Sequence, residues 1–409
     1  MSLATTMFAL WWRPRWVAPM LVDLIADELR RLRPGVPLPH VGLPSVVDNE
    51  SPDDFDADLD AVLGLDSIEL MDIVTSVSVR FGLHQHGLDR RLLVERRLKV
   101  WAETVVEARR LDDSSVSFFT SGSTGRPKRC THPMDALVRE GLHWASQLGD
   151  RRRVLRAVPC HHIYGFLFGV MLPARLGIPM LDVRDALPPG VLARAEPGDL
   201  LVGHPCFFSL AAGDADVRVA DDVVAVTSTG QCPAFVWEAL AELGVARMLE
   251  VYGSSECAGI ASRWHAAEPL TLLPWWVVEP GRERLLRADA AACIAADRWE
   301  WVNGRHFRVR GRLDGAVQVA GENVFPGRVR DVLLAHPAVA DAMVRPFGSG
   351  VAVRLKADVV PTDPDADPTN LRLELIAWLA ERLRPAERPR HIDIGSTLPQ
   401  TPAGKPGDR

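Results

Sequence analysis

The sequence predicts an α/β domain that lies between a helical N-terminal unit and a small α+β C-terminal unit. Its 409 residues exceed the usual size of one compact core, so two or three domains are expected. From about residue 115, short apolar stretches alternate with helical segments, and loops rich in Gly, Ser and Thr follow the stretches. The apolar stretches are SVSFFT (115–120), RVLRAVP (153–159), DLLVGHP (199–205), VVAVTSTG (223–230) and RMLEVYG (247–253). This alternation is typical of a sheet whose ligand site lies at the strand ends.

Composition and charge exclude several classes of protein. A net charge of -6 offers no broad attraction to nucleic acid, so no nucleic-acid partner is expected. The cysteines are dispersed and contain no C-x-x-C pair, which favours a reducing, cytoplasmic location. They are Cys130, Cys160, Cys206, Cys232, Cys257 and Cys293.

The apolar segment 7–20 (MFALWWRPRWVAPM) raises the question of a membrane segment. It is too short to span a bilayer and Arg13 and Arg15 interrupt it, so neither export nor a transmembrane segment is expected. Its three tryptophans are expected to pack against the protein.

The first 110 residues are expected to form a short extension, residues 1–18, followed by a helical domain, residues 19–110. Apolar spacing predicts helices over 19–33, 66–83 and about 92–109. Between the first two, the Pro- and Asp-rich stretch 37–58 reads as a long loop.

Residues 117–130 (SFFTSGSTGRPKRC) form the most informative segment. Small residues after a strand let backbone N–H groups surround phosphate oxygens, and a lysine adds positive charge. The spacing differs from the G-x-x-x-x-G-K-[ST] phosphate loop. The expected phosphate contacts are Thr120, Ser121, Gly122, Ser123, Thr124, Gly125 and Lys128.

Seven ordered segments between residues 113 and 409 resemble the adenylate-forming ligase superfamily, which includes acyl- and aryl-CoA synthetases and peptide-synthetase adenylation domains. The segments are TSGSTGRPK (120–128), PCHHIYGF (159–166), VYGSSE (251–256), Asp297, GRLD (311–314), AGENVFP (320–326) and TPAGK (401–405). The resemblance implies a reduced adenylation core over 113–310, a C-terminal lid over 311–409 with its hinge at Asp314, and the use of ATP with Mg²⁺.

The resemblance also assigns roles to individual residues. Glu256 would be the Mg²⁺ carboxylate, and Lys405 would bridge the substrate carboxylate and the nucleotide. Asp297 would accept the ribose hydroxyls, with Arg312 beside it. Further nucleotide contacts would come from Gly230, Tyr252, Gly253 and Ser255. His162 would adjoin the acyl pocket and gate thiol entry, and the expected pocket residues are His162, Phe166, His204 and Phe207.

The chain also departs from the family pattern. Gln318 stands where a lysine is frequent, and the large subdomain that usually precedes the phosphate loop is absent. In its place, residues 63–83 (LGLDSIELMDIVTSVSVRFGL) resemble an acyl carrier protein. Ser67 would then receive 4'-phosphopantetheine from a phosphopantetheinyl transferase. Alternatively, Asp66-Ser67 is a plain helix cap and the unit is a structural cover for the sheet.

These features together predict ATP-dependent activation of a carboxylic acid, with an aryl acid such as a hydroxybenzoate favoured. The acyl group would pass to the phosphopantetheine thiol of an acyl carrier protein, as in loading ligases of pigment or polyketide pathways. One alternative is a ligase that uses free CoA and keeps a purely structural N-terminal unit. Another is a non-catalytic nucleotide-binding scaffold.

Overall fold

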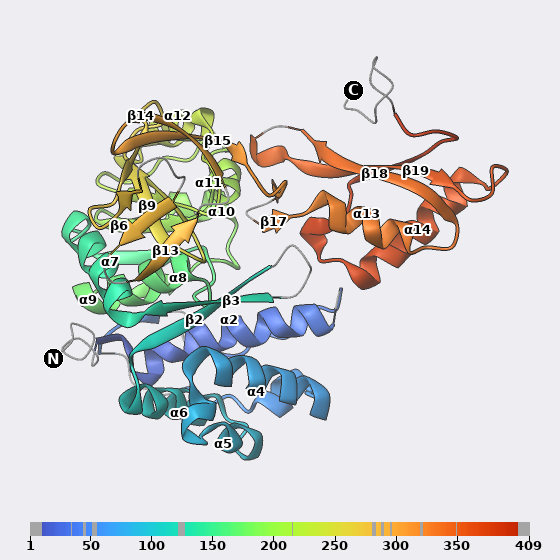
Figure 1. Cartoon of the computed structure of the whole chain (residues 1–409). Coiled ribbons are helices and arrows are strands. Elements are labelled where there is room, and N and C mark those ends of the chain that lie inside the picture. The colour runs from blue at the N-terminus through green and yellow to red at the C-terminus, as the bar shows by residue number, and fades with distance from the viewer. Residues whose placement is uncertain are drawn as a thin grey trace.

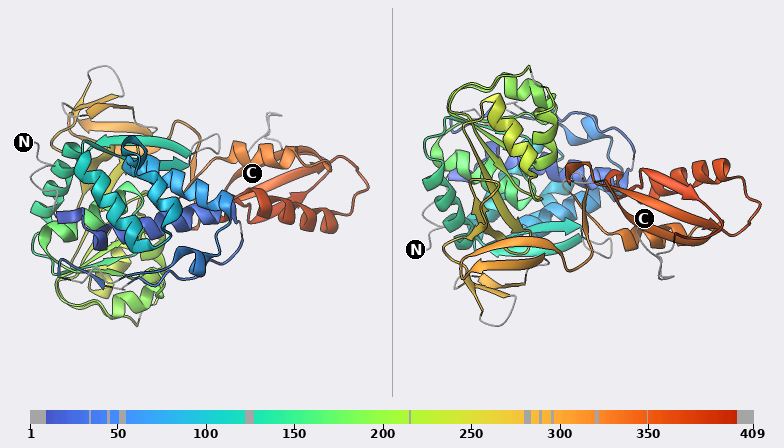
Figure 2. Two further views of the ribbon diagram at one scale, coloured as in Figure 1. Left: turned by 90° about the horizontal axis from the view of Figure 1, so that it is seen from below. Right: turned by 90° about the horizontal axis from the view of Figure 1, so that it is seen from above.

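The computed structural model describes residues 10–33, 35–43, 46–50, 55–121, 127–214, 216–279, 284–287, 290–294, 297–319, 322–348 and 350–399. Three parts are visible along the chain: helices at one end, a large sheet in the middle, and a C-terminal domain that protrudes from the rest (Figures 1 and 2). No helix in these ranges is both long enough and apolar enough to cross a lipid bilayer.

In the described residues, ten strands form the main sheet. In spatial order they are β1 (Val46–Val47), β5 (Met180–Asp182), β4 (Arg153–Arg156), β6 (Asp199–Gly203), β7 (Val224–Thr227), β8 (Arg247–Ser254), β9 (Ala258–Arg263), β10 (Leu270–Leu272), β15 (His306–Arg312) and β14 (Asp297–Asn303). The strands from β5 to β8 are parallel, whereas β9, β10, β15 and β14 are antiparallel. The five strands predicted from apolar stretches correspond to β4, β6, β7 and β8 of this sheet and to β2 (Ser115–Ser121), which belongs to a separate two-stranded sheet.

Both faces of the parallel strands are buried, which explains their nearly continuous apolar sequence. Alternate residues point to opposite sides: Val154 and Leu200 join one core cluster, and Leu155 and Leu201 join the other. On the first side lie α7 (Met134–Gln147), α8 (Ile163–Phe166), the π-helical turn η2 (Leu167–Met171) and α9 (Leu172–Leu176). On the second lie α10 (Pro188–Ala193), α11 (Pro205–Ala211) and α12 (Ala234–Leu243).

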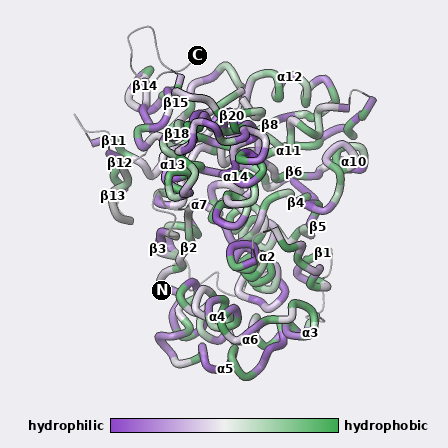
Figure 3. Tube along the Cα trace, turned by 90° about the vertical axis from the view of Figure 1, so that its right-hand side faces the viewer, coloured by the Kyte–Doolittle hydropathy of each residue, from purple (hydrophilic) through white to green (hydrophobic). Residues whose placement is uncertain are grey.

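The N-terminal helices share the first of these cores. They are α2 (Pro14–Leu32), α3 (Leu59–Leu63), α4 (Ser67–Phe81), the 3-10 turn η1 (Leu83–His86), α5 (Asp89–Val94) and α6 (Leu98–Leu111). The small helices group at one end of the molecule (Figure 3). Apolar residues of α2, α4 and α6 belong to the same buried cluster as the sheet. Asp23 on α2 also pairs with Arg156 on β4 at 2.8 Å, and both side chains are almost completely buried (2% and 1% exposed).

Several local expectations in this region need correction. The first helix begins at Pro14 and runs through the expected boundary at residue 18, because Trp16 and Val17 are buried with it. The helix expected over 92–109 is broken at 95–97, where Arg97 bridges to Asp58. The expected loop 37–58 contributes β1 to the main sheet. Trp11, Trp12 and Trp16 are buried, which confirms that they pack against the protein.

Two smaller sheets flank the core. The β2–β3 hairpin consists of β2 (Ser115–Ser121) and β3 (Pro127–Pro133). A second small sheet consists of β11 (Val277–Val278), β12 (Arg284–Arg287) and β13 (Ala290–Ile294).

The C-terminal domain has its own core. Its elements are the β16–β17 hairpin (Val317–Val319 and Glu322–Val324), α13 (Pro326–Leu334), β18 (Val339–Phe347), the 3-10 turn η3 (Gly350–Ala352), β19 (Arg354–Pro361), α14 (Pro368–Arg382), the 3-10 turn η4 (Pro385–Glu387) and β20 (His391–Ile394). The β18–β20 sheet packs against α13 and α14, so this part is the small α+β domain that the sequence predicts.

Candidate active site

The β2–β3 hairpin carries the segment expected to contact phosphates. Thr120 pairs with Lys128 across the hairpin, so Lys128 stands next to its tip. Residues 122–126, which include Gly122, Ser123, Thr124 and Gly125, lie outside the described residues, as do the side chains of Thr120 and Ser121. The Lys128 ammonium lies 3.2 Å from the Glu256 carboxylate, so the structure brings together two residues that are 128 positions apart.

Glu256 lies in the tight turn between β8 and β9. Gly253 is required there because a side chain would overlap the carbonyl of Ala258. Ala258 itself has φ +61°, a strained conformation of the kind found at functional sites. The turn is therefore held in one shape by its surroundings.

Two residues that the sequence reasoning missed fix this turn. His132 on β3 places Nε2 2.7 Å from the carbonyl oxygen of Ser255. Because a carbonyl only accepts, Nε2 donates. The backbone N–H of Gly259 donates to the buried Glu140 carboxyl group at 3.1 Å. Neither residue lies in a local motif, so only their long-range contacts reveal them.

The charge of Glu256 is favoured by its surroundings. Partial burial alone would raise its pKa, but hydrogen bonds to the carboxylate and the charge of Lys128 outweigh burial, and the net effect lowers the pKa. A half-exposed carboxylate beside the hairpin that is expected to bind phosphates fits Mg²⁺, which prefers few hard protein oxygens together with phosphates.

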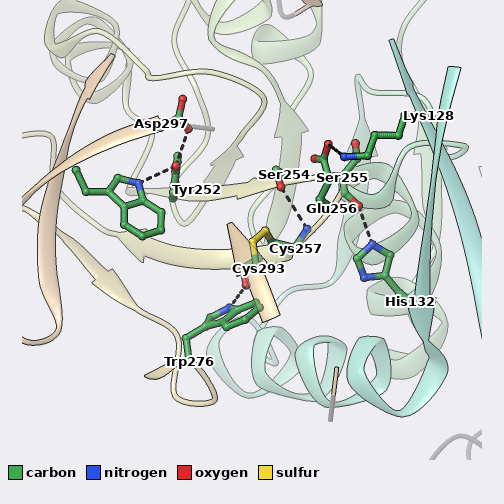
Figure 4. The surroundings of a disulfide bond; sticks show 12 residues. Lys128, His132, Tyr252, Ser254, Ser255, Glu256, Cys257, Trp276, Cys293 and Asp297 are labelled. Carbon is green, nitrogen blue, oxygen red and sulfur yellow. Dashed lines mark hydrogen bonds and ion pairs between the residues drawn. A yellow bond between two sulfur atoms is a disulfide. The ribbon is translucent and has the colours of Figure 1, made fainter. Parts of the chain in front are cut away.

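The expected ribose contacts also come together. Asp297 begins β14 and pairs in register with Arg312 of β15, with a side-chain separation of 3.6 Å. The Tyr252 hydroxyl donates to Asp297 at 2.6 Å and accepts from the Trp299 indole at 2.9 Å. Burial, followed by the Asp297 charge, raises the pKa of Tyr252, so this hydroxyl stays protonated. Figure 4 shows the side chains of Asp297 and Tyr252 pointing toward one another.

Arg312 has a second partner in Asp314, whose carboxylate accepts from Nε at 2.7 Å. Gly311 and Gly315, with φ of +123° and +71°, flank these two residues. Backbone conformations that favour glycine therefore stand on both sides of the expected hinge.

His162 stands at the N-cap of α8 with an exposed side chain, and its ring is tilted by 43° against that of the buried His161, with the centroids 4.1 Å apart. Desolvation by the surrounding protein is the main cause that lowers its pKa; the charges of Arg80 and Arg384 act in the same direction, and those of Asp27 and Asp23 oppose it. Arg384 belongs to the C-terminal domain, so this histidine faces the junction between the core and that domain.

The residues expected to line the substrate pocket lie in different surroundings. Phe166 is a correction: it is fully buried between Trp12 and Phe118, with ring centroids 6.0 and 5.6 Å away, and packs in the core rather than on an open wall. His204 caps α11 by accepting from the backbone N–H of Phe207 at 3.3 Å. The Phe207 ring is largely buried beside it.

The C-terminal domain approaches the core through its β16–β17 hairpin. A side chain on Gly230 would meet Gln318 of this hairpin at 3.6 Å. The hairpin that follows the expected hinge thus faces the end of β7. Lys405 lies outside the described residues.

Ser67 is exposed at the first position of α4. Asp66 caps this helix through the N–H groups of Ile68 and Glu69, and Glu69 completes a capping box. Arg33, which follows α2, also pairs with Glu69. The local geometry is thus that of an ordinary helix start held against α2.

A disulfide bond is present, although the dispersed cysteines favoured a reducing location. Cys257, next to Glu256, forms a disulfide with Cys293 on β13 (Figure 4). The other four cysteines are free.

Two family models match long parts of the chain. A family model described as AMP-binding enzyme matches residues 38–282, and its C-terminal domain model matches residues 329–405. The chain belongs to the AMP-binding enzyme family. The first match begins at residue 38 and therefore includes α4 and Ser67.

Similar proteins with known names indicate the type of reaction. A 4-coumarate–CoA ligase of Cereibacter sphaeroides is 39% identical, with 88% of this chain and 86% of the relative covered. Another from Rhodobacter capsulatus is 33% identical over 96% of this chain and 99% of the relative. The chain is accordingly an AMP-forming acid–thiol ligase that uses ATP. Among solved structures, the amide bond synthetase McbA from Marinactinospora thermotolerans shares the fold, with 22% identity, a TM-score of 0.59, and coverage of 72% of this chain and 68% of that one.

Proposed function

We propose that this ligase activates a hydroxycinnamate-like aryl acid and transfers the acyl group to free CoA. The observation that carries the proposal is the match to 4-coumarate–CoA ligases along nearly the whole chain, N-terminal helices included. The proposed acceptor is therefore CoA, which the sequence analysis gave as an alternative, instead of a carrier protein. The proposed acid is a hydroxycinnamate instead of the hydroxybenzoate that the sequence analysis favoured.

In the first half-reaction the acid carboxylate attacks the α-phosphorus of ATP and pyrophosphate leaves. Lys128 and the hairpin tip offset charge on the phosphates, and Glu256 would hold the Mg²⁺ that neutralises them. Asp297 accepts the ribose hydroxyls, with Arg312 supporting it. Lys405 would stabilise charge where the two anions meet.

In the second half-reaction a thiol attacks the acyl carbon and AMP leaves. His162, which faces the C-terminal domain, lines the entrance for the thiol. Rotation of this domain about Asp314 would exchange Lys405 for the β16–β17 hairpin at the site.

A second acceptor, a phosphopantetheine on Ser67, is favoured by one observation. Ile68 and Met71, beside Ser67 on α4, are 72% and 52% exposed and provide an apolar surface for a modifying enzyme. Against it, α4 is packed into the common core and paired to Arg33, so Ser67 sits on a fixed helix.

Competition between acceptors tests the proposal. Purified enzyme receives ATP, Mg²⁺ and 4-coumarate with equimolar CoA and a phosphopantetheinylated carrier protein, and products are separated by chromatography. We expect the CoA thioester to dominate by at least tenfold. Acylation of the carrier with CoA left unreacted would contradict the proposal. A mass increase on Ser67 after co-expression with a phosphopantetheinyl transferase would support the second acceptor.

A further inference from the structure

We propose that the Cys257–Cys293 disulfide positions the phosphate-side and ribose-side segments of the site against each other and thereby sets the affinity for Mg·ATP. The inference rests on the nucleotide roles given above to Glu256 and Asp297. It makes Cys257 and Cys293 positioning residues.

The cross-link joins two segments that flank nucleotide contacts. Cys257 directly follows Glu256 in the β8–β9 turn, and Cys293 precedes Asp297 by four positions. Their Cα atoms lie 5.6 Å apart, and both side chains are buried. In Figure 4 the sulfur bridge lies between the Ser254–Glu256 turn and the strand that carries Cys293.

The β11–β13 sheet needs such an anchor. In the described part of the chain, its three strands pair only with one another and none joins the main sheet. Packing of Leu285 and Trp276 into the core, with the Trp276 indole donating to the Gly259 carbonyl at 2.6 Å, holds one side of it. The disulfide provides a covalent link from this sheet to the residue next to Glu256.

The turn itself also requires support. Ala258 has positive φ, so the Glu256–Ala258 backbone adopts a shape that it would leave if the surroundings relaxed. Within the turn, the Cys257 N–H donates to Ser254 Oγ at 3.2 Å. Loss of the cross-link removes the covalent restraint on one side of this strained turn, and Glu256 then spends less time beside Lys128.

The bond is made and broken by exchange with a small disulfide or dithiol. On oxidation, the two thiols lose two protons and two electrons to glutathione disulfide, which becomes two molecules of glutathione. On reduction, a dithiol such as dithiothreitol supplies the two electrons and two protons and becomes a cyclic disulfide.

The experiment compares oxidised and reduced wild-type enzyme. Non-reducing peptide mapping establishes whether Cys257 and Cys293 are linked. Calorimetric titration with Mg·ATP then gives Kd for each form, and acid-dependent pyrophosphate exchange gives KM and kcat. We expect reduction to raise Kd and KM for ATP about tenfold, equivalent to the loss of one well-placed contact, while kcat changes less than twofold.

Matched variants separate this role from a general effect of thiols. Cys293→Ser should bind Mg·ATP as weakly as the reduced enzyme in either redox state. Cys206→Ser, which removes a free and more accessible thiol, should respond to reductant as the wild type does.

Three results would overturn the proposal: unlinked cysteines after oxidation, equal Kd in both forms, or a fall in kcat with KM unchanged. An enzyme without exchange in either form would instead refute the proposed function, and the ATP titrations would still decide the role of the disulfide.

Discussion

Replacement of Glu140 by Gln should change how stability depends on pH. Glu140 on α7 is buried, and it accepts hydrogen bonds from Gly259 and from the Trp144 indole at 3.2 Å. Burial is the main cause that raises its pKa from 4.5 to about 7. The folded protein therefore keeps a proton on Glu140 that the unfolded chain has already lost.

The direction in which stability changes with pH follows from the number of protons bound in each state. Between pH 4.5 and about 7 the unfolded state binds fewer protons at this group, so the free energy of unfolding falls as pH rises. At 1.36 kcal/mol per pH unit, the loss is roughly 3 kcal/mol once pH exceeds 7. Glutamine keeps an accepting oxygen for Gly259 and has no proton to lose.

Urea unfolding of wild type and Glu140→Gln at pH 5, 6, 7 and 8 measures this effect. The stability of the variant relative to wild type should increase with pH by roughly 3 kcal/mol and level off above pH 7. Glu238→Gln, at an exposed position of α12, is the control and should show a flat difference. A flat difference for Glu140→Gln as well would refute the reasoning, because Glu140 would then be ionised in the folded protein throughout.

Three further changes test separate parts of the account. Asp297→Asn should raise KM for ATP about tenfold, as measured by pyrophosphate exchange, because a ribose acceptor is weakened; an unchanged KM would remove Asp297 from the nucleotide site. Asp23→Ala should lower the free energy of unfolding by about 2 kcal/mol, since the buried Arg156 then keeps Asp182 but loses one charged hydrogen-bond partner; an unchanged free energy in urea unfolding would mean that this contact between α2 and β4 does not contribute to stability. Lys405→Ala should reduce acid-dependent exchange at least about 100-fold with every active acid; preserved exchange would dismiss the role given to Lys405.

The strands of the parallel sheet could be predicted from the sequence. Strands β4, β6, β7 and β8 are short apolar runs, each followed by a polar loop, and burial on both faces requires that pattern. The pairs Lys128–Glu256 and Asp297–Arg312 join residues of separate motifs that the resemblance assigned to one nucleotide site. Ordered motifs locate such contacts because each lies at a strand end or a tight turn.

Other features depend on contacts between distant residues. The burial of α2 becomes evident only through the pairing of Asp23 with Arg156, which are 133 positions apart. A periodic apolar helix has the same sequence pattern whether it packs in a separate bundle or against a sheet. The Cys257–Cys293 bond was missed for a similar reason, because a separation of 36 residues carries no motif.

Phe166 illustrates a further limit. Its position next to the His162 segment suggested a pocket wall, yet its ring stacks on Trp12 and contacts Phe118 at an angle of 50°. Proximity in sequence cannot distinguish the two faces of a helix when both are apolar.

The central claim is that this site joins an organic carboxylate to the α-phosphorus of ATP. Its most direct test is pyrophosphate exchange into ATP across a panel of cinnamates, benzoates and fatty acids, with Mg²⁺ present and no thiol. The account predicts exchange that requires the acid and is fastest with hydroxycinnamates. An absence of acid-dependent exchange with the entire panel would contradict it.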